Sequence, residues 1–290
     1  MRLQSMSNVK IGIDVGGTTL KLGVVQNGLD ILYRDTRPSP HDAEKMAAEL
    51  YDMIITAQKQ FPGAPSAIST AGTIDENGCL DANQLGFEKA PVGPLLFDTL
   101  GYKIPIENDG VCALVAEHAV GSLKGCHSCL MITLGTGVGG GVIVNDKPYR
   151  GYRNVHAELG HMITHVDGKK CSCGQTGCWE AYASASALSE MAGGMAPRDV
   201  IDRVRNGEMQ DIFAAWVHEV AQGLIGLCSI FYPERIAIGG GLSNAGELVV
   251  GAIRDAVLSE EAYKNYYAPL QVVQAHFQND AGILGAAALA

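Results

Sequence analysis

Two pairs of short apolar strands, each interrupted by a glycine-rich turn, dominate the pattern of hydrophobic and polar positions along the chain. In the first pair, apolar runs over 9–14 and 20–26 flank Gly16-Gly17-Thr18-Thr19. In the second pair, apolar runs over 129–134 and 142–144 flank another turn rich in glycine. A strand follows the glycines in both places, whereas a dinucleotide-binding fingerprint requires a helix there, so that fingerprint is excluded. The repetition predicts an internal duplication with two similar α/β halves.

The two turns have the chemistry of a phosphate-binding site. Glycines let a phosphate approach the backbone closely, and successive N–H groups form a nest for an anion. Asp14 is a candidate for holding a Mg²⁺-bound water, and the threonines of the first turn add hydroxyl donors. An ordinary glycine hairpin is the alternative at each turn. The nucleotide-binding candidates in the turns are Asp14, Gly16, Gly17, Thr18, Thr19, Lys21, Gly135, Thr136, Gly137 and Gly139.

A third glycine cluster ends the short apolar strand predicted over 235–238. Gly240 and Gly241 there either admit a flat adenine ring against the backbone or make a tight strand-to-helix turn. Helical periodicity also predicts an amphipathic helix over 43–59 and a long, mostly apolar helix over 210–231. Because the long helix is apolar over most of its length, we expect it to be buried.

The stretch from Ile106 to Glu117 predicts a strand that passes directly into a helix ending near Gly121. Asp109 lies at the turn between them, where the carboxyl end of a strand usually meets a ligand in α/β sheets. The alternative is a helix N-cap, since Asp accepts backbone N–H bonds at that position. Asn83, a polar residue in a predicted loop, is a candidate ligand for a hydroxyl or a turn-stabilising residue.

Three cysteines within eight residues and one histidine form a metal-binding pattern. Cys171, Cys173 and Cys178 supply three thiolates, and His161 lies ten residues before the first of them. Three thiolates and one imidazole are a closed tetrahedral set for Zn²⁺, so the predicted zinc is structural. It would fix the loops that carry Glu158 and Glu180, while the other ring nitrogen of the histidine remains able to face a ligand.

Composition limits the classes of partner. The 290 residues are 47% hydrophobic and carry a net charge of −10, which argues against broad binding to nucleic acid or anionic membranes. No apolar run of 18 residues predicts a membrane span, and residues 1–10 lack the apolar region of a secretory signal. Clustered free cysteines fit a reducing compartment, and we expect a cytoplasmic protein.

Taken together, these motifs resemble the ROK family of sugar kinases, whose name abbreviates repressor, open reading frame, kinase. The resemblance runs in order from residue 9 to residue 287 and is carried by Asp14–Lys21, Glu107-Asn108-Asp109, Leu134–Gly141, Glu158–His161, Cys171–Glu180, Ile238–Gly241 and Asp280–Ala286. It implies an actin-like (ribonuclease H-like) ATPase fold with two α/β lobes and a central cleft. The lobes would be residues 1–112, with the helix over 280–290 returning to them, and residues 113–279.

The resemblance also implies roles for individual residues. Asp109 would be the general base, and the glycine turns would hold the phosphates of ATP with Mg²⁺. The residues implied to bind the sugar are Gly72, Asn83, Asn108, Asp109, Glu158, His161 and Glu180, and the zinc ligands are His161, Cys171, Cys173 and Cys178. Two departures from the family pattern are Val111 and His156-Ala157, and the second, which lies beside Glu158, leaves the sugar preference open. A homodimer is what the family suggests.

The expected activity is ATP-dependent phosphorylation of the 6-hydroxyl of a hexose or N-acylhexosamine. Two segments, 67–75 and 275–282, look most like N-acetylmannosamine kinases, with glucose second. One alternative is a non-catalytic, sugar-binding regulator of the same family. Such regulators carry a DNA-binding helix-turn-helix before the first phosphate strand, and that strand starts here at about residue 9. An actin- or chaperone-like ATPase is a further alternative that leaves the zinc pattern without a role.

Overall fold

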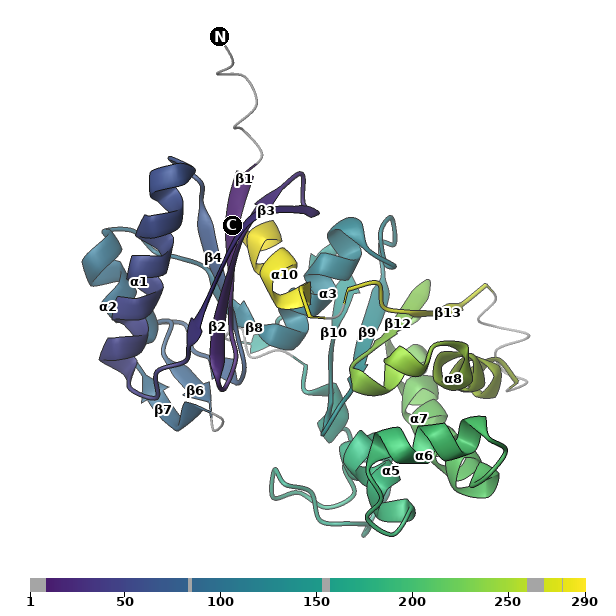
Figure 1. The fold of residues 1–290 in the computed structure, drawn as a ribbon. Helices are drawn as coiled ribbons and strands as arrows, with labels where there is room; N and C mark the ends of the chain where they lie inside the picture. Colours follow the sequence, from purple (N-terminus) through teal and green to yellow (C-terminus); the bar gives the residue numbers. More distant parts are fainter. Residues whose placement is uncertain (1–8, 83–84, 153–156, 260–268, 278) are drawn as a thin grey trace. The chain divides into compact units, whose positions relative to one another are not determined.

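The computed structural model describes residues 9–82, 85–152, 157–259, 269–277 and 279–290 (Figure 1). The chain divides into two compact units. The first unit comprises the chain up to Gly121, the segment that begins at Arg150, and the end of the chain from Asn279; the second comprises the rest. A division at residue 112, as expected from the sequence, would cut helix α3 (Asp109–Val120), which lies whole in the first unit.

The first unit is built on a five-stranded mixed sheet with the strand order β3-β2-β1-β4-β8. Strands β1, β2 and β3 are antiparallel neighbours, whereas β4 and β8 run parallel to β1. The bounds are β1 (Val9–Val15), β2 (Thr19–Gln26), β3 (Asp30–Pro38), β4 (Ser66–Thr70) and β8 (Ile106–Asn108). A small antiparallel sheet follows β4 and contains β5 (Thr73–Ile74), β6 (Leu80–Ala82) and β7 (Phe87–Ala90).

Helices cover both faces of this sheet (Figure 1). Helix α1 (Ala43–Gln60), capped by Asp42, packs its apolar side with α2 (Val92–Leu100) into one core. On the other face, α10 (Ala281–Leu289) contacts β1 and α3. The approach is very close, because a Cβ atom at Gly285 would lie 1.8 Å from the carbonyl oxygen of Cys112. The small residues of the last helix therefore permit backbone contact with its neighbours.

The second unit repeats this topology. Its sheet has the order β11-β10-β9-β12-β13, again with antiparallel strands on one side and parallel strands on the other. The strands are β9 (Cys129–Leu134), β10 (Val138–Val144), β11 (Lys147–Pro148), β12 (Arg235–Gly239) and β13 (Gln271–Gln274). The two sheets match strand for strand, as the internal duplication predicts.

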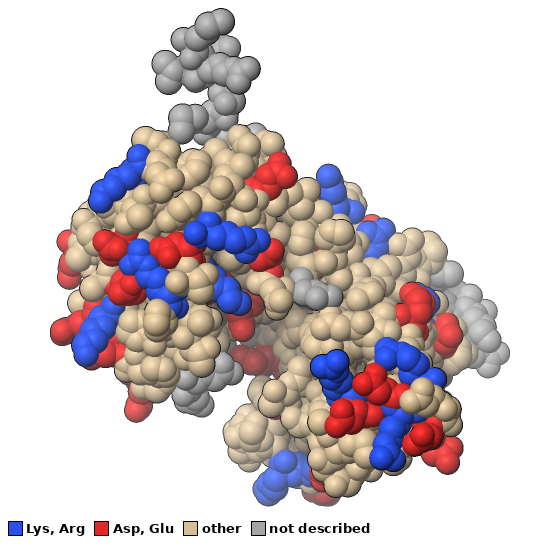
Figure 2. All heavy atoms as spheres, viewed as in Figure 1, with Lys and Arg blue, Asp and Glu red and all other residues tan. Residues whose placement is uncertain are grey.

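The helical layers of the second unit enclose two buried tryptophans, Trp179 and Trp216. The helices are η3 (Leu159–His161), α4 (Glu180–Ala183), α5 (Ala185–Met191), α6 (Pro197–Arg205), α7 (Gln210–Phe231), η4 (Gly241–Ala245) and α8 (Glu247–Ser259). By length and composition alone α7 could cross a membrane, but 50% of its most apolar window is buried and it forms part of this core. On the face shown in Figure 2, basic side chains are interspersed with acidic ones.

Candidate functional site

The first predicted phosphate turn joins β1 to β2 and is held by Ser39. The Ser39 hydroxyl donates to the carbonyl oxygen of Gly16 at 2.6 Å, and its backbone N–H donates to that of Thr18 at 3.0 Å. These bonds fix the carbonyl groups of the turn. Thr18 itself is exposed. No sequence pattern marks Ser39, which directly follows β3, the strand whose last residue pairs with Thr19.

Asp14 lies at the end of β1 beside this turn. It pairs with Lys21 and Ser69 on the adjacent strands, and the Ser69 hydroxyl donates to Asp14 Oδ1 at 3.1 Å. Burial raises the pKa of the Asp14 carboxyl above its ordinary value, more than Ser69 and Lys21 lower it. A nearby cation would stabilise the charged form of this half-buried carboxyl. The position therefore suits a residue that holds a Mg²⁺-bound water.

Asn108, and not Asp109, caps helix α3. Asn108 Oδ1 accepts the backbone N–H groups of Gly110 at 2.9 Å and of Val111 at 3.3 Å, while Nδ2 donates to the carbonyl oxygen of Gly72 at 2.9 Å. The alternative reading of Asp109 as the N-cap is therefore wrong, because Asp109 is the first helical residue and is exposed. Its Oδ1 atom accepts the Gly110 N–H at 2.8 Å.

Position 72 requires a glycine. Its φ is +87°, and a Cβ atom there would lie 2.1 Å from the carbonyl oxygen of Asp81. Val111, the departure from the family pattern beside the candidate base, is buried, with only 1% of its surface exposed. Asn83 and His156 lie outside the described residues, and Ala157 is half-buried.

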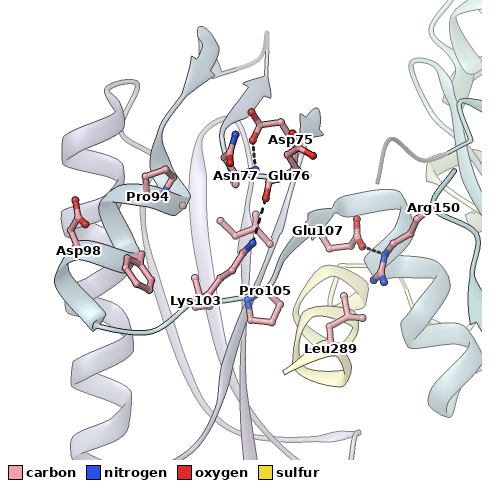
Figure 3. A pocket seen from close by; sticks show the side chains of 16 residues that line it. Asp75, Glu76, Asn77, Pro94, Asp98, Lys103, Pro105, Glu107, Arg150 and Leu289 are labelled. Carbon is pink, nitrogen blue, oxygen red and sulfur yellow. Dashed lines mark hydrogen bonds and ion pairs between the residues drawn. The ribbon is translucent and has the colours of Figure 1, made fainter. Parts of the chain in front are cut away.

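The residue before Asn108 is a buried glutamate, and its ion pair with a half-exposed arginine was missed by sequence reasoning. Arg150 Nε donates to Glu107 Oε2 at 2.8 Å, and the Glu107 side chain is only 8% exposed (Figure 3). The pair borders a cavity of about 790 Å³, which is also lined by Ile74, Lys103, Ile106 and Leu289. The described residues that line this cavity include none of the predicted site residues, so it is distinct from the candidate active site.

The second predicted phosphate turn joins β9 to β10 and is held from α4 and α5. The Gly135 carbonyl oxygen accepts the Ala185 N–H at 2.8 Å, and the Thr136 carbonyl oxygen accepts the Ser186 hydroxyl at 2.7 Å. On the other side of the turn, the Val138 N–H donates to Glu180 Oε2 at 2.9 Å. The carbonyl groups and the end of the turn are thus fixed by the segment that follows the cysteine cluster.

At the third glycine cluster the structure favours the tight turn. Gly240 has a φ of +84°, and a Cβ atom there would lie 2.5 Å from backbone atoms of Leu134. The Ser243 hydroxyl donates to the Gly240 carbonyl oxygen at 2.8 Å. An added Cβ at Gly241 would have no neighbour within 4 Å, so contact with an adenine ring remains a prediction for this exposed residue.

The four predicted metal ligands converge in the second unit. The ligand atoms of His161, Cys171, Cys173 and Cys178 all lie within 4.8 Å of one another. Cys173 Sγ is 3.7 Å from Cys178 Sγ, and Cys171 Sγ is 3.6 Å from His161 Nδ1. Tetrahedral bonds of about 2.3 Å to sulfur place two thiolates about 3.8 Å apart, so these residues fit Zn²⁺.

The thiols of this cluster have unequal environments. A backbone hydrogen bond from Gln175 lowers the pKa of the Cys173 thiol, whereas burial raises the pKa of Cys178 to about 12. A divalent cation deprotonates coordinating thiols outright, so bound Zn²⁺ would offset the effect of burial on Cys178. All four ligands would come from protein, which would leave no open position and give the ion a structural role.

The remaining sugar-ligand candidates lie on two short segments beside the cluster. Glu158 is exposed, and its carbonyl oxygen accepts the His161 N–H at 3.0 Å at the start of η3. Glu180 begins α4 two residues after Cys178. The Trp179 N–H donates to the Met162 carbonyl oxygen at 2.8 Å, which joins the two segments.

Comparisons with known proteins agree with this arrangement. A model of the ROK family matches residues 10–290. The chain is 31% identical to a glucokinase of Thermotoga maritima over 96% of each chain, and 30% identical to an N-acetylmannosamine kinase of Citrobacter koseri over 97% of this chain and 98% of that one. A ROK family glucokinase from Streptomyces griseus, solved in complex with glucose and AMPPNP, superposes with a TM-score of 0.78 at 31% identity over 97% of this chain and 99% of that one.

The chain therefore belongs to the ROK family. Its two matching α/β sheets form the actin-like ATPase fold that the resemblance implied, and the expected fold class is confirmed. Over its whole length the chain is similar to sugar kinases of that family.

Proposed function

We propose that this protein is an ATP-dependent kinase that phosphorylates the primary 6-hydroxyl of a hexose, with Asp109 as the general base. The observation that carries this proposal is the environment of Asp109. Asn108 supplies the cap of α3, and the Asp109 carboxylate lies exposed on the first turn of that helix, where its Oδ1 accepts the Gly110 N–H. A base of this kind must come within about 2.6–3.2 Å of the hydroxyl that it deprotonates.

The two glycine turns are proposed to hold the phosphates of ATP. Backbone N–H groups and threonine hydroxyls surround the transferring phosphoryl group in such sites, where catalysis rests on positioning and charge stabilisation. Asp14 would hold Mg²⁺ through a water molecule, and the ion would supply positive charge at the phosphates. The bonds from Ser39 and from Ala185 and Ser186 fix both turns before a nucleotide arrives, which reduces the ordering that binding requires.

The sugar hydroxyls are proposed to meet Glu158, His161, Glu180 and one remaining amide hydrogen of Asn108. Asn carries two amide hydrogens, and Gly72 accepts one of those on Asn108. Asn83 is proposed as a further contact from the sequence alone. Zinc at the cluster would hold the loops of Glu158 and Glu180 in place.

We place glucose first among acceptors and N-acetylmannosamine second, the reverse of the order that two sequence segments favoured. The similarity at 31% identity to glucokinases of two organisms supports this order. The similarity at 30% to an N-acetylmannosamine kinase keeps the second acceptor under test.

The test is coupled ADP release from ATP and Mg²⁺ with glucose, N-acetylmannosamine, N-acetylglucosamine, fructose and allose offered singly. Turnover with glucose above all others supports the proposal, and turnover with N-acetylmannosamine alone reverses the order of acceptors. Sugar binding by calorimetry without any sugar-dependent ADP release would favour the non-catalytic regulator.

A further inference from the structure

We propose that Glu180 is a positioning residue for the second phosphate turn, in addition to any contact with sugar, and that it links this turn to the zinc cluster. The inference rests on the proposed function in so far as the turn between β9 and β10 binds ATP. Its physical basis lies wholly within the second unit, in the contacts around Val138 and Glu180.

Val138 is the residue at which the glycine turn enters β10. Its N–H donates to Glu180 Oε2 at 2.9 Å, and its carbonyl oxygen packs against Gly160, where a Cβ atom would approach within 2.1 Å. Val138 is thus held on one side by the segment that begins α4 and on the other by the segment that carries Glu158 and His161. The two predicted sugar-binding segments both contact one residue of the predicted phosphate turn.

The contact between Glu180 and the turn also explains why position 137 is a glycine. A Cβ atom at Gly137 would lie 2.2 Å from Glu180 Oε2. The carboxylate therefore lies directly against the turn backbone, and any larger residue at this position would displace it. A hydrogen bond to a charged acceptor is stronger than one between neutral groups, so this bond is a main restraint on the turn.

Glu180 does not take the place of a phosphate in this arrangement. Val138 is only 5% exposed and its N–H already donates to Glu180, so this N–H is not available to a ligand arriving from solvent. The residues of the turn that precede it, Thr136 above all, are the more exposed ones. We infer that the Glu180 carboxylate orients the turn from its buried side. The N–H groups on the exposed side of the turn are then left for the nucleotide.

The other carboxylate oxygen of Glu180 faces the zinc cluster. Glu180 Oε1 lies 3.4 Å from Ser172 Oγ and 3.8 Å from Cys171 Sγ. Because Cys178 precedes Glu180 by two residues, an ion held by the cluster fixes the backbone from which the Glu180 side chain projects. Loss of zinc should therefore loosen the phosphate turn as well as the sugar-binding segments.

The experiment compares Glu180→Ala, Glu180→Gln and Glu158→Ala in the full chain, with zinc content measured for each. Hydrogen exchange of the amides over 135–139 reports the turn directly, and AMPPNP with Mg²⁺, in the absence of sugar, reports nucleotide affinity. We expect Glu180→Ala to speed exchange and to weaken AMPPNP binding by about tenfold, the size typical of a lost charged hydrogen bond. Glu180→Gln keeps an acceptor oxygen for Val138 but not the charge, so it should lose less than Glu180→Ala in both measurements.

Glu158→Ala is the matched control, because it removes a sugar-ligand candidate whose side chain, among the described residues, forms no hydrogen bond with 135–139. It should leave both readouts as in the wild type. Chelation of zinc from the wild type should speed exchange over 135–139 in the same way as Glu180→Ala.

If Glu180→Ala leaves exchange and sugar-free AMPPNP binding unchanged while its zinc is retained, the positioning role is wrong and Glu180 acts on sugar alone. If AMPPNP binds more tightly to Glu180→Ala, the carboxylate competes with phosphate and the inference is overturned. Failure of the wild type to bind AMPPNP would instead contradict the proposed function, while the exchange measurement would still decide whether Glu180 holds the turn.

Discussion

The side-chain amide of Asn108 donates to the carbonyl oxygen of Gly72, 2.9 Å away, while the oxygen of the same amide caps α3. One side chain therefore fixes both the loop after β4 and the start of the helix that carries Asp109. This relationship explains how a strand of only three residues, β8, can hold the proposed general base in a defined place.

Two substitutions at Asn108 separate these two roles. Asn108→Asp keeps the capping oxygen but removes the donor to Gly72, whereas Asn108→Ala removes both. We expect Asn108→Ala to destabilise the fold by about 1–2 kcal/mol, the typical effect of losing an N-cap, and Asn108→Asp to cost less. Denaturation by urea measures both. Equal stability of Asn108→Ala and wild type would show that the cap contributes nothing.

The ion pair between buried Glu107 and half-exposed Arg150 gives a second prediction. Arg150→Ala leaves a carboxylate that is 8% exposed without its guanidinium, and we expect a loss of about 1–3 kcal/mol in unfolding free energy. The double variant Glu107→Gln with Arg150→Ala should recover part of this loss, because no buried charge then remains at position 107. A double variant no more stable than Arg150→Ala would contradict this account.

The charged Asp14 carboxylate, proposed to hold Mg²⁺, should make the folded protein less stable than a neutral side chain at the same position would. Burial raises the pKa of its carboxyl, so the folded state binds the proton more tightly than the unfolded state does. As the pH rises, the unfolded chain loses this proton first, at the ordinary pKa of Asp, and the folded protein loses it only at a higher pH. The stability that the bound proton contributes is therefore lost between these two pKa values and is absent at neutral pH. We expect Asp14→Asn to raise the melting temperature at neutral pH, with Ser69 still able to donate to the amide oxygen.

The gain from Asp14→Asn should shrink on acidification, because the wild-type carboxyl then becomes neutral too. Binding of AMPPNP with Mg²⁺ should weaken in the same variant. Asp98→Asn, at an exposed position in the same unit, is the control and should leave the melting temperature unchanged. A melting temperature that falls in Asp14→Asn at neutral pH would show that the charged form is stabilised by partners.

Zinc should be required for the second unit to fold fully. Cys178→Ser removes a buried ligand of the cluster, and we expect loss of bound zinc and a lower melting temperature. Cys79→Ser, which lies outside the cluster, should retain one equivalent of zinc. Because thiolate and imidazole ligands must lose protons to bind, zinc should also be released as pH falls. Metal analysis after dialysis checks each point, and full zinc retention by Cys178→Ser would reject the assignment of that ligand.

Local patterns in the sequence predicted the parts of this structure that depend on neighbouring residues. Spacing alone indicated the zinc ligands, and glycine turns between apolar strands predicted the duplicated sheets. Long-range bonds have no such local signal: Glu180 is 42 residues from Val138, and Glu107 is 43 from Arg150. An N-cap was the alternative role for Asp109, and Asn108 takes that position instead; both residue types suit it, so only the backbone geometry distinguishes them.

The most direct test of the central claim is the turnover of Asp109→Asn. The variant replaces a proton acceptor with an amide of the same shape. We predict that sugar-dependent ADP release falls by about 10²–10⁴-fold while glucose and AMPPNP still bind with near wild-type affinity. Near-full activity in Asp109→Asn, from a folded protein loaded with zinc, would contradict the assignment of Asp109 as the general base.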